Sequence, residues 1–175
     1  MIPQFEPEKN YQKTTEGYAT VRFQDCDPLG HLNNARYFDY FLNSRADEIQ
    51  KIYNFDTLDI FKQFGASWVI YNHNISFIRP AMMGEKVKIH SRIISIDKYT
   101  IIIEFFMTNE DSTDLKNLLW SNMKFVDGKT GKLTEHPLEL TTYLSAILYP
   151  VDINEGVQQR IKMLKIELMR SQQSL

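Results

Sequence analysis

The sequence predicts a single α+β domain in which one antiparallel sheet covers a long helix. Three observations support this class. One alternating segment comes first, a long helical pattern follows it, and a run of strand-like segments comes after the helix. This segregated order favours an antiparallel sheet over alternating βαβ units. The chain has 175 residues, of which 43% are hydrophobic, so it can fill one ordinary core but not two.

The N-terminal segments predict an arm and a strand. Residues 1–15 are polar and contain two prolines, which indicates an extended arm. Residues 17–24 alternate between polar and apolar side chains, as a half-buried strand does. The N-terminus lacks the apolar stretch of a signal peptide, and no apolar run approaches the ~18 residues of a membrane span, so we expect neither.

A long buried helix is predicted over residues 34–50. Its polar residues form one narrow face at Arg36, Asp39, Asn43, Asp47 and Gln50. Apolar side chains cover most of the remaining surface, so we expect protein to surround the helix. Asn33 is a suitable N-cap because its short side chain can accept a hydrogen bond from the first turn. A second, short helix is expected over residues 56–64 and is ended by Gly65.

Four strands are predicted over residues 67–78, 85–96, 99–108 and 115–126. After Pro137 the pattern changes, and residues 154–170 have the apolar spacing of an amphipathic helix that packs on the domain or on a partner subunit. We therefore expect a domain over residues 1–137 and a helical extension over residues 138–175.

Composition argues against several classes of protein. The formal net charge is −2, which gives no reason to expect a nucleic-acid partner. The single cysteine, Cys26, cannot form an internal disulfide, which is consistent with a cytoplasmic protein. The histidines His73, His90 and His136 lack metal-ligand spacing with acids or cysteine, so we expect no metal.

The segment 25–34, DCDPLGHLNN, has the parts of an active site. Asp25 and Asp27 are two residues apart, so in an extended segment their side chains point the same way. Pro28 and Gly30 then turn the chain into a helix, whose free first N–H groups can stabilise an oxyanion. A carboxylate beside such a group could serve a hydrolase. Acidic turns before helices are common, however, so spacing alone favours a structural role.

The run VRFQDCDPLGHLNNARY, residues 21–37, resembles the signature of the 4-hydroxybenzoyl-CoA thioesterase family. These are hotdog-fold acyl-CoA thioesterases. The resemblance extends over residues 16–137 and includes ISFIRP at 75–80, Gly84, and the His136-Pro137 pair. It implies a curled antiparallel sheet around the long helix, hydrolysis of acyl-CoA without a cofactor, and homodimers or homotetramers with active sites between subunits.

By this resemblance, Asp27 is the catalytic carboxylate, acting as a general base or as a nucleophile. The backbone N–H near Asn34 polarises the thioester carbonyl, and His31 belongs to the same catalytic loop. His31 could transfer protons or simply hold the loop, and both interpretations stay open. The candidate substrate-binding positions are Gly30, Asn33, Tyr37 and Arg79, of which Arg79 could contact the phosphates of CoA.

Two further functions stay open. Acyl-ACP thioesterases share the Asp…His-x-Asn-Asn pattern, but they usually carry asparagine at the position of Leu29 and have a second hotdog unit. A non-catalytic hotdog module that binds an acyl ligand or serves as a scaffold is the other alternative.

Several neighbouring residues are given structural interpretations. We expect Asp25 to support the loop, and Cys26, between two acids, to be a poor nucleophile. Basic residues share one face of the strand 85–96 and could contact the phosphates of CoA, although a solvated surface is the favoured interpretation. These are Lys86, Lys88, His90 and Arg92.

Overall fold

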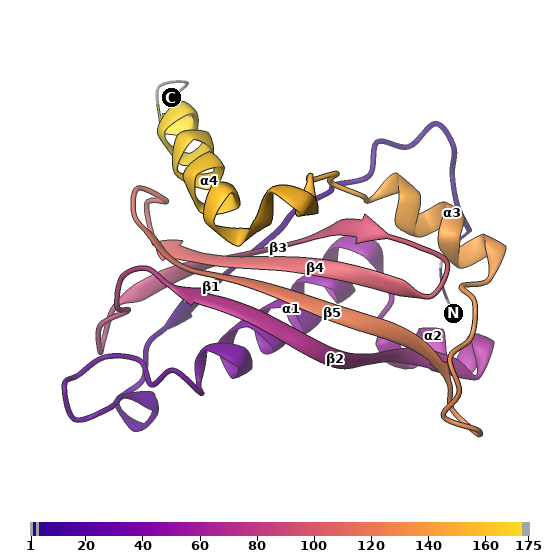
Figure 1. Ribbon diagram of the computed structural model, residues 1–175, viewed down its shortest axis with the longest axis horizontal. Helices are drawn as coiled ribbons and strands as arrows, with labels where there is room; N and C mark the ends of the chain where they lie inside the picture. The colour runs from indigo at the N-terminus through magenta and orange to yellow at the C-terminus, as the bar shows by residue number, and fades with distance from the viewer. Residues whose placement is uncertain (1, 3, 173–175) are drawn as a thin grey trace.

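The computed structural model describes residues 2 and 4–172, in which helices cover both faces of one sheet (Figure 1). The strands are β1 (Thr15–Thr20), β2 (Ala66–Phe77), β3 (Lys86–Ile96), β4 (Thr100–Asn109) and β5 (Leu115–Asp127). The helices are α1 (Tyr37–Tyr53), α2 (Thr57–Phe64), α3 (Leu138–Ala146) and α4 (Gly156–Gln172). Short 3-10 turns occupy Phe23–Asp25 and Ile153–Glu155.

The sheet has five strands in the order β1-β3-β4-β5-β2, and every neighbouring pair is antiparallel. The predicted α+β class is therefore confirmed. The first strand ends at Thr20 rather than at residue 24, because the chain leaves the sheet for the 3-10 turn before the site loop.

The main core lies between α1 and the sheet. Phe41 of α1 contacts Phe105 of β4 with ring centroids 5.4 Å apart, and both are fully buried. The helix begins three residues later than predicted, at Tyr37, and ends before Asn54, whose φ of 58° is one that asparagine tolerates. The expectation that protein surrounds this helix is wrong for the single chain. The sheet covers one side, and Leu42 and Ala46 of the helix remain exposed.

Part of the expected C-terminal extension contributes to this same core. Tyr143 of α3 is buried, and its ring lies 5.2 Å from the ring of Phe55 and 5.1 Å from that of Tyr11 in the N-terminal arm. Leu140 and Leu144 are buried with it. Helix α3 therefore closes the end of the core where α1 finishes.

Helix α4 packs against the opposite face of the sheet, as the amphipathic pattern predicted for a helix on the domain. Its buried residues Ile161, Leu164 and Leu168 join a second apolar cluster with Phe106 and Trp120 of the sheet. No helix in the described range is both long and apolar enough to cross a membrane.

The basic face of β3 is mostly buried, which corrects the expectation of a solvated surface. Lys86 remains exposed, but the side chains of His90 and Arg92 are only 6% and 5% exposed. Strand β1 provides Glu16, which contacts His90 at 3.2 Å and also pairs with Lys88. Arg92 is enclosed by α4 and strand β4. These groups therefore have protein partners and do not offer an open surface for CoA phosphates.

Candidate active site

Asp27 lies in a closed turn between β1 and α1. The N–H of Asp27 donates to the carbonyl of His31 at 2.8 Å, and the carbonyl of Asp27 accepts from the N–H of Gly30 at 3.0 Å. Pro28 fixes one backbone angle of this turn, and Gly30 adopts a φ of 76°, which favours glycine. Local residues therefore set the shape of the turn, and hydrogen bonds from Met83 N–H to the Gly30 carbonyl and from Leu32 N–H to the Ala81 carbonyl attach it to the segment after β2.

The same turn holds one oxygen of the Asp27 carboxylate. Oδ1 accepts hydrogen bonds from the N–H groups of Leu29 at 2.9 Å and His31 at 3.1 Å. Oδ2 has no hydrogen-bond partner among residues 2 and 4–172. The carboxylate is thus fixed in orientation while one oxygen stays available for chemistry.

A hollow of about 200 Å³ lies beside this carboxylate. It is lined by Asp27, His31, Leu32, Asn34, Tyr37, Phe77, Ile78, Arg79 and Pro80. All three predicted catalytic residues, and two of the four predicted binding residues, therefore line one hollow. Gly30 and Asn33 shape the turn and do not line its wall.

Asn33 organises the approach to α1. Its Oδ1 accepts from the N–H of Ala35 at 3.0 Å, and its carbonyl accepts from the N–H of Arg36 at 2.8 Å. It therefore caps a turn that precedes α1 rather than the helix itself, because α1 begins only at Tyr37. The N–H of Asn34 has no hydrogen-bond partner within the described part of the chain. This turn leaves one donor available at the residue that lines the hollow.

Tyr37 anchors the inner wall of the hollow. Its side chain is 2% exposed, and its hydroxyl accepts a hydrogen bond from the N–H of Ala81 at 3.2 Å. Its ring meets that of Phe77 edge-on at 5.3 Å. Burial raises the pKa of Tyr37, so the phenol stays neutral. Tyr37 therefore joins α1 to the segment that follows β2.

Arg79 and His31 occupy the outer part of the hollow. Arg79 pairs with Asp114 at 2.8 Å, and its side chain is 65% exposed. His31 is half-buried, and its ring has no hydrogen-bond partner among the described residues. A ligand in the hollow would meet a paired cation at the mouth and an imidazole beside the carboxylate.

Asp25 supports the loop and is separated from Asp27. It accepts a hydrogen bond from the Tyr40 hydroxyl at 2.9 Å, and its carbonyl accepts from the N–H of Asn33 at 2.9 Å. It borders a different, polar groove, so the expectation that both acids point the same way is wrong. The reason is the 3-10 turn, which breaks the extended backbone at Asp25.

Cys26 is unsuited to nucleophilic attack. Burial and the neighbouring carboxylates of Asp25 and Asp27 raise the pKa of its thiol. Its Sγ donates to the carbonyl of Arg22 at 3.3 Å. The thiol therefore remains protonated and engaged with the backbone.

The residues from β2 were not singled out as site residues by sequence reasoning. Phe77 and Ile78 reach the hollow because the end of β2 passes beside the N-terminus of α1. The alternation of strand 67–78 grouped Phe77 with His73 and Ile75 on one face, but it did not indicate that this face meets the helix. No group of His, Cys, Asp and Glu in the described range could hold a metal ion.

The sequence pattern of the Thioesterase-like superfamily matches residues 21–158. The long-chain acyl-CoA thioesterase FadM of Escherichia coli is 28% identical over 90 residues, which cover 51% of this chain and 66% of that enzyme, just under two thirds of its length.

Solved structures agree on the fold. The probable thioesterase YbaW from Escherichia coli has a TM-score of 0.68 at 24% identity, covering 77% of this chain and 99% of that one. The protein SAV2348 from Staphylococcus aureus, solved in complex with CoA, has a TM-score of 0.69 at 13% identity, covering 81% of this chain and 90% of that one. With a hotdog architecture and a family pattern that spans most of its length, the chain belongs to the Thioesterase-like superfamily.

Proposed function

We propose that the protein hydrolyses acyl-CoA thioesters to a free acid and CoA. The observation that carries this proposal is the pairing of a fixed carboxylate, Asp27, with the available N–H of Asn34 on one hollow. Hydrolysis needs these two elements, one to activate or replace water and one to stabilise the oxyanion. The relative named as a long-chain acyl-CoA thioesterase and the neighbour solved with CoA support the substrate class.

In the proposed reaction, the thioester oxygen accepts a hydrogen bond from the N–H of Asn34. As a general base, Asp27 takes a proton from water while the water oxygen attacks the carbonyl carbon. As a nucleophile, Asp27 forms an anhydride with the acyl group, which water then cleaves. In both routes the C–S bond breaks, CoA leaves as a thiolate, and the thiolate is protonated.

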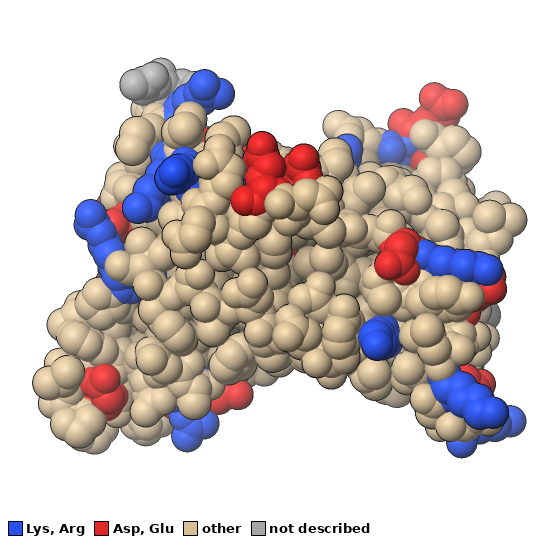
Figure 2. Space-filling model, in the orientation of Figure 1, with Lys and Arg blue, Asp and Glu red and all other residues tan. Residues whose placement is uncertain are grey.

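Assembly into a homodimer or homotetramer is part of the proposal. Strand β2 pairs with β5 on one side and is the last strand of the sheet on the other. Its side chains Val69, Ile70 and Tyr71 are exposed, which is unusual for a stable free edge. Figure 2 shows few charged residues at the centre of the face over β2, β4 and β5. Light scattering that gave only the monomer mass of 20.6 kDa would contradict this assembly.

The test of catalysis is Asp27→Asn, assayed by thiol release from short, long and aromatic acyl-CoA substrates. Loss of a general base or nucleophile should lower kcat by about 100-fold or more. The matched control is Asp39→Asn, which removes an exposed carboxylate of α1 that pairs with Arg36 outside the hollow. A folded Asp27→Asn protein with wild-type turnover would refute the assignment.

Two other outcomes address the alternatives. Faster cleavage of acyl-ACP than of the matched acyl-CoA would assign the protein to carrier-protein substrates. If the wild-type protein releases no thiol from any substrate of the panel, a non-catalytic binding module would be favoured. The single cysteine, Cys26, is consistent with the cytoplasmic location that we propose for this reaction.

A further inference from the structure

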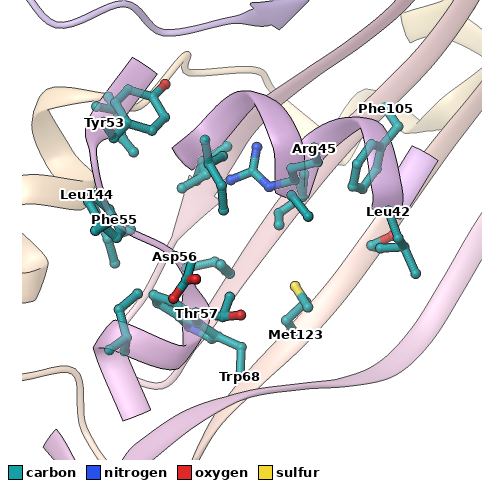
Figure 3. Close-up of a pocket in the computed structure, with 18 residues that line it drawn as sticks. Leu42, Arg45, Tyr53, Phe55, Asp56, Thr57, Trp68, Phe105, Met123 and Leu144 are labelled. Atoms are coloured by element: carbon teal, nitrogen blue, oxygen red, sulfur yellow. The ribbon is translucent and has the colours of Figure 1, made fainter. Parts of the chain in front are cut away.

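A second, largely apolar cavity of about 220 Å³ lies between α1 and the sheet (Figure 3). We call it the inner chamber. Its walls come from α1, α2, the sheet and α3, and include Leu42, Trp68, Phe105, Met123 and Leu144. It shares no lining residue with the hollow at Asp27. Helix α1 lines both cavities, the hollow at Tyr37 and the chamber from Leu42 onward.

The spacing along α1 fits an acyl chain that extends from one cavity to the other. Tyr37 lines the hollow and Ala46 lines the chamber, nine residues further along the helix. Nine residues of α-helix span about 14 Å, which an extended chain of roughly twelve bonds would cover. Phe38, which follows Tyr37 in α1, has its ring 4.8 Å from that of His73. His73 also shares a 2.9 Å hydrogen bond with Ser121, which lines the chamber.

One cation, Arg45, interrupts the apolar wall of the chamber. Figure 3 shows its nitrogen atoms with apolar side chains around them. Its guanidinium donates to the Ser91 hydroxyl at 2.9 Å and makes no ion pair within the described residues. Asp56 also lines the chamber, but its carboxylate caps α2 by accepting from the Asp59 N–H at 2.8 Å. The chamber thus contains a guanidinium with most of its donors unused.

Arg45 is partly buried, and the two arginines that are fully buried have different surroundings. Arg92 and Arg160 both pair with the buried carboxylate of Glu104, and both also contact Glu167. Burial without such a partner lowers the pKa of Arg45 to about 10, so the group is still charged at neutral pH. Even a partly buried charge that lacks an ion-pair partner costs stability, and such a cost is typical of a binding site.

We infer that Arg45 makes the chamber selective for acyl chains that end in a carboxylate. This inference rests on the proposed thioesterase function and names its substrate class: CoA thioesters of α,ω-dicarboxylic acids of roughly twelve carbons, from the bond count above. The thioester lies at Asp27, the methylene chain follows α1, and the distal carboxylate accepts hydrogen bonds from Arg45. Pockets of this kind are mostly apolar, with a few polar groups that fix orientation.

The test compares the CoA thioesters of dodecanedioic acid and dodecanoic acid as substrates. The wild-type protein should favour the dicarboxylic substrate in kcat/KM by about 10- to 100-fold, the range expected for hydrogen bonds to a charged group. Arg45→Met should abolish this preference, and Arg45→Lys should retain part of it. The control is Lys165→Met, an exposed cation on α4 across the sheet, which should leave the ratio unchanged. Equal rates for both substrates in the wild-type protein would overturn the inference.

Binding of the free acids provides a test that does not depend on hydrolysis. Calorimetry should show that wild-type protein binds dodecanedioate more tightly than dodecanoate, and that Arg45→Met loses the difference. If no thioester is cleaved, the proposed function fails while this comparison still decides the role of Arg45. Thermal unfolding distinguishes a role of Arg45 in substrate binding from a role in stabilising the fold. Arg45→Met should keep or raise the Tm, because an uncompensated charge is removed. A lower Tm with unchanged selectivity would refute the inference.

Discussion

The charged cluster under α4 provides the sharpest test of what holds this helix to the sheet. Glu104 of β4 is fully buried and accepts four hydrogen bonds, one from Arg92, two from Arg160 and one from Trp120, each at 2.9 Å. Glu104→Gln removes the charge with little change of shape. Both arginines would then depend on Glu167, which is 35% exposed in its side chain.

The magnitude follows from the burial of these groups. Removing one partner from a buried ion pair costs about 3–5 kcal/mol. For a domain of this length, that corresponds to a fall in Tm of roughly 6–20 °C. The assay is thermal unfolding followed by circular dichroism, with hydrogen exchange to locate the loss of protection in α4. Activity should persist, since the cluster lies on the face of the sheet away from Asp27.

Two control variants test whether the effect of Glu104→Gln comes from unpaired buried charge. Glu110→Gln removes an exposed ion pair with Lys86 and should leave the Tm almost unchanged. The triple change Arg92→Met, Glu104→Leu and Arg160→Met replaces the charges with apolar volume and should be neutral or stabilising. If Glu104→Gln lowers the Tm no more than Glu110→Gln does, the buried cluster does not fasten α4. If the triple variant is as unstable as Glu104→Gln, unpaired charge is not the cause.

Two further predictions concern pH and packing. Burial lowers the pKa of His90 below 6.5, although Glu16 opposes this shift. Below pH 6.5 the unfolded chain therefore binds more protons than the folded protein. The free energy of unfolding should fall by up to about 1.4 kcal/mol for each unit by which the pH is lowered. His90→Phe should flatten the fall in Tm between pH 7 and 5, and an unchanged slope would contradict this. A Cβ added at Gly17 of β1 would collide with Ser44 Oγ of α1, so Gly17→Ala should cost about 1–3 kcal/mol. Adding Ser44→Ala should recover most of that loss in a double-mutant cycle of unfolding free energies, and no recovery would locate the strain elsewhere.

Glu104 also bears on the pH dependence of the whole fold. Burial opposes its ionisation, but Arg160 and Arg92 outweigh burial and lower its pKa below the ordinary 4.5. Its contribution to stability is therefore complete above pH 4.5 and is lost as the pH falls below that value. Acid titration of the Tm should show this loss in the wild-type protein and not in Glu104→Gln.

The elements that could be predicted are those whose signal is local. Alternation located the strands because each has a face on the α1 core, as Ile101, Ile103 and Phe105 do on β4. The site loop was predictable for the same reason. Pro28, Gly30 and Asn33 set its turns through contacts within a few residues, although Met83 also donates to the Gly30 carbonyl. Phe77 was missed as a site residue because its position depends on how β2 lies beside α1, which no local pattern states.

The error about the face of β3 has a different cause. Alternation separates two faces of a strand, but it cannot say whether the second face is covered. His90 and Arg92 look like a solvated face until residues 156–172 pack over it. The sequence did contain a sign that another element packs over this face of β3. Glu104 stands alone in the run IIIEFFM, and a carboxylate among such neighbours is buried only when cations reach it. The chain carries one such cation on β3 and another, Arg160, in the amphipathic C-terminal helix, so the acid in β4 predicts where that helix must lie.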